Sequence, residues 1–187
     1  MKNHSFLFIF PLLAGSWLLA QKHTDTLPAR QNKGKQNVIA FGFYLPAGVF
    51  SQSHFAGAGI DYSRSHYRFG KNISPDKFIG FIVNGGVNYY AGKRITTAGF
   101  DFRYGGFINL YAMPGIIYNP VKHGNVSLLA GPALNIYKKS ATAGFGINLL
   151  SNYFISENIA MSPGIIYKKH INTDALWAIT IRASYIF

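Results

Sequence analysis

The chain of 187 residues contains no cysteine. Disulfide bonds, thiolate metal sites and the lipid-modified cysteine of a bacterial lipoprotein are therefore excluded. Acidic residues are also few, with six Asp and Glu against 18 Lys and Arg, which gives a formal net charge of +12. An excess of this size suits a nucleic acid, an anionic membrane surface or an acidic ligand as a partner.

Charged residues make up only 13% of the chain, whereas a soluble domain carries about a quarter. After the N-terminus, no apolar run approaches the roughly 18 residues of a membrane-spanning helix. Aromatic residues nevertheless reach 16%, and there are 20 glycines. This combination favours a transmembrane β-barrel, because a closed sheet satisfies its own backbone hydrogen bonds in lipid without long apolar runs.

Residues 1–20 have the pattern of a secretory signal peptide, with a basic start, an apolar core and small residues before the expected cleavage after Ala20. Cleavage after Ser16 is the alternative site. A membrane anchor fits less well, because the apolar run is short and contains Pro11 and Gly15. An exported chain meets phosphorylated lipids rather than nucleic acid, so we expect an anionic membrane surface and no nucleic-acid partner.

The remaining chain divides into a polar lead-in without periodicity, residues 21–36, which we expect in the periplasm, and a patterned domain, residues 37–187. The last stretch, residues 174–187, shows the pattern most clearly. Alternate residues are apolar and begin and end with aromatics: Trp177, Ile179, Ile181, Ala183, Tyr185 and Phe187. The intervening positions include Thr180, Arg182 and Ser184. This alternation predicts a strand with lipid on one side and a polar lumen on the other.

The same period of two recurs along the whole domain, with polar breaks and no helical pattern. Small residues gather on the predicted lumen face, which leaves room there for large ones such as Tyr90, Tyr111 and Tyr137. We therefore predict an all-β fold, a transmembrane antiparallel up-and-down β-barrel of eight strands. The predicted strands are residues 37–50, 55–67, 78–91, 96–118, 126–137, 143–155, 159–167 and 174–187.

The segment 96–118 is unusually long for one strand. Its alternation keeps the same parity on both sides of Gly105 and Gly106. A tight turn at these glycines would reverse the parity and place Asn109 in lipid. We therefore predict one long strand that rises above the membrane. Ten strands remain the alternative, if this segment is split and another strand lies upstream.

Residues 37–187, with the terminal aromatics Tyr185 and Phe187, resemble the small outer-membrane barrels of the OmpA/OmpX type. The resemblance implies a Gram-negative outer-membrane protein that the barrel-assembly machinery folds. It also implies that Tyr185 and Phe187 form the assembly signal.

Counting strands back from Phe187 at the periplasmic rim places four breaks outside the cell: residues 51–54, 92–95, 138–140 and 168–174. Three of them carry adjacent basic residues. We predict that these residues contact the phosphates of lipopolysaccharide through charge-assisted hydrogen bonds. The alternative is a solvated rim that only protects strand ends. The basic residues are Lys93, Arg94, Lys138, Lys139, Lys168, Lys169 and His170.

Parity places four further charged residues, Asp61, Asp101, Arg103 and Arg182, in the lumen or on the long strand. An eight-stranded barrel is about wide enough for its own side chains only. We therefore predict an interior polar network in which opposite charges pair away from water, rather than a path for solutes.

These patterns favour a non-enzymatic barrel that serves envelope integrity or surface interaction, with an unknown surface or periplasmic protein as a further possible partner. A narrow channel for small solutes is the alternative. A lipid A-modifying enzyme is a second alternative, because Ser51, Ser53 and His54 share one outer loop, although no acidic residue lies close in sequence. The six histidines lack ligand spacing, so we expect neither a metal site nor a cofactor.

Overall fold

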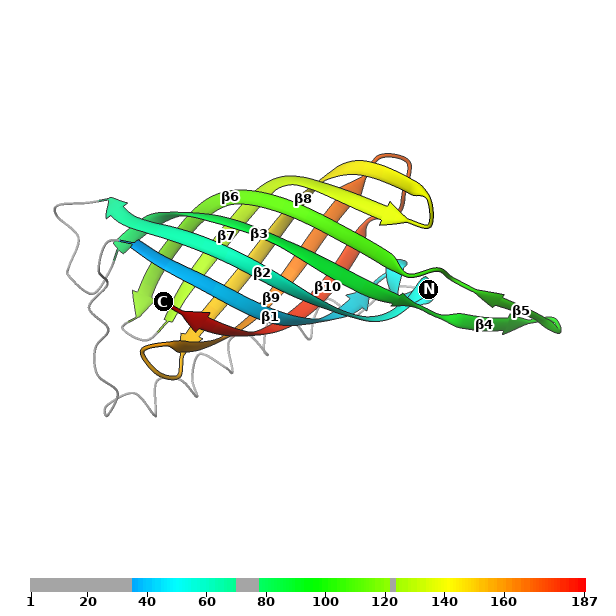
Figure 1. The fold of residues 1–187 in the computed structure, drawn as a ribbon, viewed down its shortest axis with the longest axis horizontal. Helices are drawn as coiled ribbons and strands as arrows, with labels where there is room; N and C mark the ends of the chain where they lie inside the picture. The colour runs from blue at the N-terminus through cyan, green and yellow to red at the C-terminus, as the bar shows by residue number, and fades with distance from the viewer. Residues whose placement is uncertain (1–34, 70–77, 122–123) are drawn as a thin grey trace.

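The computed structural model describes residues 35–69, 78–121 and 124–187, and they form a closed antiparallel barrel (Figure 1). Its eight strands are arranged in the order β1-β10-β9-β8-β7-β6-β3-β2, which confirms the predicted fold and strand number. The strands are β1 Lys35–Ala47, β2 His54–Phe69, β3 Phe78–Gly92, β6 Phe107–Val121, β7 Gly124–Tyr137, β8 Ser140–Phe154, β9 Ile159–His170 and β10 Leu176–Ile186.

The predicted signal peptide lies outside the described residues, as does the lead-in as far as residue 34. β1 begins at Lys35, two residues before the predicted start of the barrel. Within the described residues, no helix has the length and hydropathy that crossing a membrane would require.

The two ends of the barrel differ. At one end, which we call the terminal end, β1 begins and β10 finishes. The other end, the hairpin end, carries a short helical turn, α2 (Phe50–Ser53), and a separate two-stranded sheet formed by β4 (Arg94–Thr97) and β5 (Phe100–Arg103). This hairpin projects beyond the barrel at the right of Figure 1. A backbone hydrogen bond of 2.8 Å from Lys93 to Ser53 ties its base to α2.

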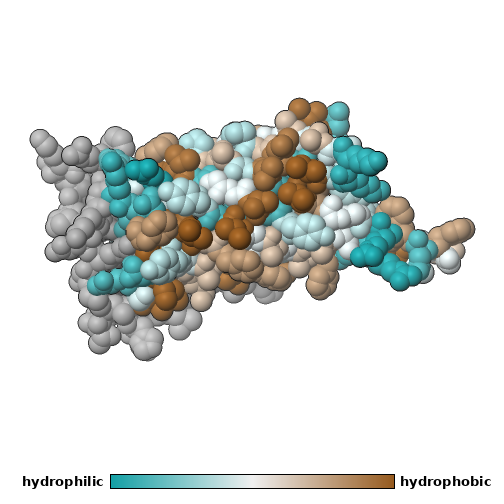
Figure 2. Space-filling model, viewed as in Figure 1, coloured by the Kyte–Doolittle hydropathy of each residue, from teal (hydrophilic) through white to brown (hydrophobic). Residues whose placement is uncertain are grey.

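The outer wall is apolar because alternate side chains point away from the lumen. Phe41, Ile60 and Ile116 are each more than half exposed although they are large and apolar. Figure 2 shows apolar colours along the middle of the wall and hydrophilic colours toward both ends. The barrel strands are 11 to 16 residues long, enough for the 9 to 11 residues that cross a bilayer. This wall has the surface of a transmembrane barrel rather than of a soluble one.

The prediction of one strand over residues 96–118 is wrong. The chain instead reverses at Ala98 and Gly99, which both have positive φ, 50° and 83°, as a two-residue hairpin turn requires. β5 then descends and β6 begins at Phe107. Within β6 the predicted parity is confirmed: Asn109 is buried in the lumen and Leu110 faces outward.

Three glycines lie where the hairpin joins the barrel: Gly92 at the end of β3, and Gly105 and Gly106 just before β6. A Cβ added at Gly106 would overlap the Tyr89 ring, and one at Gly92 would overlap the backbone of Tyr104 and Gly105. The chain therefore passes close over β3 at this point, and glycine is needed for the approach rather than for a turn.

Because the β4–β5 sheet shares no strand with the barrel, its removal should leave the barrel intact. In the test variant, the dipeptide Asn-Gly replaces residues 94–103 between Lys93 and Tyr104. We expect its unfolding free energy to match that of the parent within about 0.5 kcal/mol. Urea unfolding in lipid vesicles, followed by the fluorescence of Trp177, measures this. A failure to fold would show instead that the hairpin holds the hairpin end together.

Candidate functional site

A buried ion pair lies inside the barrel. Arg182 of β10 donates from Nη1 to Oδ2 of Asp61 of β2 at 2.9 Å, and the two side chains are 3% and 1% exposed. Tyr44 donates to the same oxygen at 2.9 Å, and Tyr111 donates to Oδ1. The two charged residues flank β1, where Asp61 pairs with Ala40 and Arg182 pairs with Gly42.

Small residues make this network possible. A Cβ at Gly42 would lie 2.6 Å from the Tyr44 hydroxyl oxygen, and one at Gly86 would overlap the Asp61 carboxylate. Glycine therefore clears the space in which the tyrosines and the ion pair meet. The sequence analysis found Asp61 and Arg182 by parity, but it could not show that they are partners.

Lys168 and His170 were predicted at the outer rim, and that placement is wrong. β9 continues through His170, so both residues keep the lumen-facing parity, and both are buried. Lys168 donates to Oδ1 of Asn109, and its Nζ lies 3.8 Å from the centre of the Tyr111 ring. The Asn109 amide in turn donates to Asn135 at 2.6 Å. Lys168 thus belongs to the interior polar network.

Asp101 and Arg103 show the opposite error. Both were predicted to join the interior network, yet both are exposed on β5, outside the barrel. Asp101 accepts hydrogen bonds from Thr96 and Arg94 across the hairpin. These two hydrogen bonds hold the pKa of the Asp101 carboxyl below its ordinary value of 3.8, and the bond from Thr96 has the larger effect. The parity prediction was wrong because the chain leaves the barrel wall before β5.

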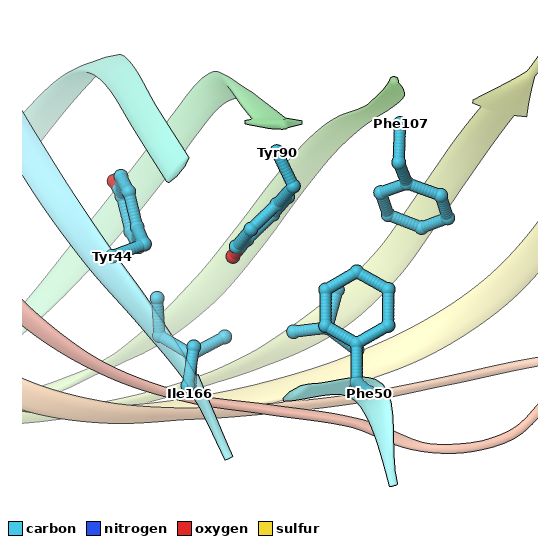
Figure 3. Packing of buried hydrophobic residues seen from close by; sticks show 7 residues of the cluster. Tyr44, Phe50, Tyr90, Phe107 and Ile166 are labelled. Atoms are coloured by element: carbon cyan, nitrogen blue, oxygen red, sulfur yellow. The ribbon is translucent and has the colours of Figure 1, made fainter. Parts of the chain in front are cut away.

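An apolar cluster occupies the lumen toward the hairpin end (Figure 3). The Phe50 ring of α2 packs edge-on against Tyr90 at 5.3 Å and Phe107 at 5.2 Å between centroids. Tyr137 packs against the same cluster. With this end of the lumen filled, the structure lends no support to an open channel. The buried members are Tyr44, Phe50, Tyr90, Phe107, Ile166, Leu176 and Ala178.

Ser51, Ser53 and His54, in the first loop of the hairpin end, have structural partners. Ser53 Oγ lies 2.8 Å from Nδ1 of His54 and 3.1 Å from the carbonyl oxygen of Phe50, while Ser51 donates to Gly48. The His54 ring is buried and stacks on Phe50 at 4.3 Å. The described residues place no carboxylate in hydrogen-bonding contact with this ring, so the orienting acid of a Ser-His-Asp site is missing. They also contain no group of three or more possible metal ligands.

Basic side chains surround the hairpin end. Lys93 donates to the Ser51 carbonyl oxygen at 2.6 Å, Arg94 pairs with Asp101, and Lys169 donates to the Thr173 carbonyl oxygen. Lys138 and Lys139 form the exposed turn between β7 and β8, where Lys138 has a φ of 54°. Arg103 adds a cation that the sequence analysis had assigned to the lumen. The described residues of this end thus include six Lys and Arg residues but only two acidic residues, Asp101 and Asp174.

At the terminal end, Tyr185 and Phe187 are more than half exposed and face outward, with ring centroids 6.4 Å apart. Toward the hairpin end, Tyr167 and Trp177 form a similar outward pair at 4.6 Å. Aromatic side chains at both borders of an apolar wall are typical of transmembrane barrels, where they lie at the two membrane interfaces.

Comparison with solved structures identifies the same architecture. The chain is similar to Ail, the attachment invasion locus protein of Yersinia pestis, in a complex with the heparin analogue sucrose octasulfate, with 10% identity, a TM-score of 0.54 and coverage of 83% of this chain and 100% of that one. The backbone structure of Ail in a phospholipid bilayer nanodisc gives 14% identity, a TM-score of 0.56 and the same coverage. The fold is that of the small outer-membrane barrels. Neither the family models nor the curated proteins searched contain a match to the sequence.

The ion pair should show strong coupling in a double-mutant cycle. Asp61→Asn leaves a buried, unpaired guanidinium and should cost about 3–5 kcal/mol of unfolding free energy. The double variant Asp61→Asn/Arg182→Met should cost clearly less than the two single changes added together. Urea unfolding in lipid vesicles measures all three variants, and additive costs would contradict the pairing.

The lowered pKa of Asp101 predicts the acid behaviour of the hairpin. The carboxylate stabilises the hairpin when ionised, so this contribution is present above the ordinary pKa of 3.8 and is lost as the pH falls through the lowered value. An NMR titration of Asp101 should therefore have its midpoint below 3.8. Thr96→Val should raise the midpoint more than Arg94→Gln does. An unchanged midpoint in both variants would show that these two hydrogen bonds do not lower the pKa.

Proposed function

We propose that this chain is a non-enzymatic outer-membrane barrel whose hairpin end faces the cell exterior and binds the phosphates of lipopolysaccharide. Its role is then envelope integrity or interaction at the cell surface. The observation that carries the proposal is the excess of exposed basic residues at one end of an apolar-walled barrel.

The orientation follows from the loops. Transmembrane barrels have short turns on the periplasmic side and longer loops outside. The β4–β5 hairpin is the longest excursion at the hairpin end, and both ends of the barrel domain lie at the opposite end. With this orientation the exposed cations meet the outer leaflet, where the phosphates of lipopolysaccharide are held.

The chemistry of the basic residues suits such a surface. Lys138 and Lys139 are exposed in a tight turn just above the apolar wall, and Arg103 stands on the hairpin. Each basic side chain near an anionic lipid surface contributes about 1 kcal/mol. The similar protein Ail was solved with a polysulfated sugar bound, so a barrel of this fold accommodates a polyanionic ligand.

We further propose that residues 1–20 are a cleaved signal peptide and that Tyr185 and Phe187 are recognised by the barrel-assembly machinery. The exposure of both aromatics supports this: Tyr185 lies near the end of β10, and Phe187 directly follows that strand. Phe187 exchanges two backbone hydrogen bonds with Asn37, at 3.0 and 3.2 Å, so the terminal residue also completes the ring.

The test of lipopolysaccharide binding removes two rim charges. In Lys138→Gln/Lys139→Gln we expect affinity for bisphosphorylated lipid A in mixed micelles to fall about tenfold or more. The salt dependence of binding should weaken together with the affinity, since fewer ionic contacts remain. Isothermal titration calorimetry of the refolded barrel measures both quantities.

The matched control is Lys35→Gln/Arg64→Gln, which removes two exposed charges toward the terminal end and should leave binding unchanged. Dephosphorylated lipid A is the ligand control and should bind the parent and the rim variant alike. Equal losses in the rim variant and the control variant would mean that net charge alone drives binding, and the proposed rim site would then be wrong.

A further inference from the structure

One face of the β4–β5 hairpin is apolar and aromatic. Ile95 pairs with Phe102 across the two strands, and nearer the tip Thr97 pairs with Phe100. Such cross-strand partners point to the same side of a sheet. The Phe102 ring also packs edge-on against Tyr104, with 4.8 Å between the ring centroids. The apolar face therefore extends from the base of the hairpin to its tip.

The opposite face is polar and basic. Arg94 pairs with Arg103 there, and Thr96 pairs with Asp101. Like charges directly opposite each other destabilise a sheet. Of the two arginines, only Arg94 has a carboxylate partner, Asp101, among the described residues. Two arginines and one aspartate leave residues 94–103 with a net charge of +1.

The apolar face is open to solvent. Phe100 is 80% exposed and Phe102 is 53% exposed. The hairpin is two strands wide and projects beyond the barrel (Figure 1), so its tip is a protrusion rather than a groove. In water, neither the exposed rings nor the opposed arginines stabilise the hairpin. Both features suit a partner that is apolar and deformable inside and anionic at its surface.

A bilayer of anionic lipids has this structure, and the dimensions agree. Antiparallel strands rise about 3.4 Å per residue, so Phe100 lies about 10 Å beyond Arg103 along β5. The apolar faces of interfacial elements enter about 5–10 Å into the boundary between headgroups and acyl chains. With Phe100 at this depth, Arg94 and Arg103 are level with the lipid phosphates. Asp101 lies between these levels, where Thr96 and Arg94 donate hydrogen bonds to it.

We propose that the hairpin inserts Phe100 and Phe102 into a bilayer of anionic phospholipids that faces the hairpin end, while Arg94 and Arg103 contact its phosphates. This bilayer is a second membrane, because the hairpin projects away from the wall that the barrel's own membrane surrounds (Figure 1). With the hairpin end outside the cell, as proposed above, it belongs to another cell or to a vesicle. The insertion itself depends neither on that orientation nor on the lipopolysaccharide site.

The experiment measures binding between two membranes. The refolded barrel is held in nanodiscs of phosphatidylcholine, with empty nanodiscs as the blank, and is floated in a density gradient with vesicles of phosphatidylglycerol and phosphatidylcholine. The parent should float with these vesicles, and far less with vesicles of phosphatidylcholine alone. No lipopolysaccharide is present, so the result is independent of the proposed rim site. A parent that does not float with the anionic vesicles would overturn the proposal.

Variants locate the contact. Phe100→Ser/Phe102→Ser should weaken vesicle binding about a hundredfold, because both rings lose their burial in the bilayer. Arg103→Gln should weaken it about fivefold, as expected for one cation at an anionic lipid surface. Heat-modified mobility in gels checks that each variant is folded.

The matched control is Val49→Ser/Ile171→Ser, which removes two exposed apolar side chains from other turns of the same end. This variant should bind the vesicles as the parent does. Equal losses in the phenylalanine variant and in the control would show that the apolar surface is merely adhesive, and the proposed insertion would be wrong.

A fluorescent label tests the insertion directly. Because the chain has no cysteine, Thr97→Cys offers a single site on the apolar face for an environment-sensitive dye. Its emission should shift to the blue when anionic vesicles are added, and bromine-labelled acyl chains should quench it. The same dye at Asp174→Cys, in the turn between β9 and β10, should remain in water. A label at position 97 that stays in water while the vesicles bind would mean that charge attraction alone joins the membranes, and the proposal would be overturned.

Discussion

The unbroken ring of backbone hydrogen bonds is the constraint on which the rest of this structure depends. In lipid an unpaired N–H or C=O costs several kcal/mol, so the sheet has to close. Ten residue pairs join β1 to β10, and Asn37 with Phe187 extends this seam to the last residue. Once the ring is closed, a period of two decides the environment of every side chain, because odd and even positions face opposite sides of one wall.

The interior is governed by the size of this ring. Eight strands leave space for side chains only, so each large residue requires a small one beside it. Tyr44 lies over Gly42 and Tyr90 over Gly57, while the Asp61 carboxylate uses the space above Gly86. The Asp61 carboxylate on β2 thus receives hydrogen bonds from three other strands, β1, β6 and β10. Bulk and polarity in the lumen are therefore matched both along a strand, as in β1, and across neighbouring strands.

This explains which features could be predicted from the sequence. Period and parity were sufficient for the barrel, its strand number and the lumen position of Asp61 and Arg182. They were not sufficient to find where a strand leaves the wall, because alternation continues in β5, outside the barrel sheet. Asp101 and Arg103 were therefore placed inside, and the turn at Ala98 and Gly99 was missed. Lys168 was placed outside for the converse reason: a lysine near the end of a strand suggests a rim, whereas the pairing of β9 with β8 extends to His170 and keeps Lys168 in the lumen.

Two sets of cations among the described residues lie in contrasting environments. Arg103, Lys138 and Lys139 stand in solvent at the hairpin end, where salt screens them and where a large anionic surface can approach. Arg182 and Lys168 are buried, where charge is costly, and their partners come from the protein: Asp61 for Arg182, and Asn109 with the Tyr111 ring for Lys168. The aromatic cluster of Phe50, Tyr90 and Phe107 fills the lumen toward the hairpin end. The positive charge of these residues is therefore distributed between a solvated rim, which a partner can approach, and a buried network, which packing and hydrogen bonds hold in place.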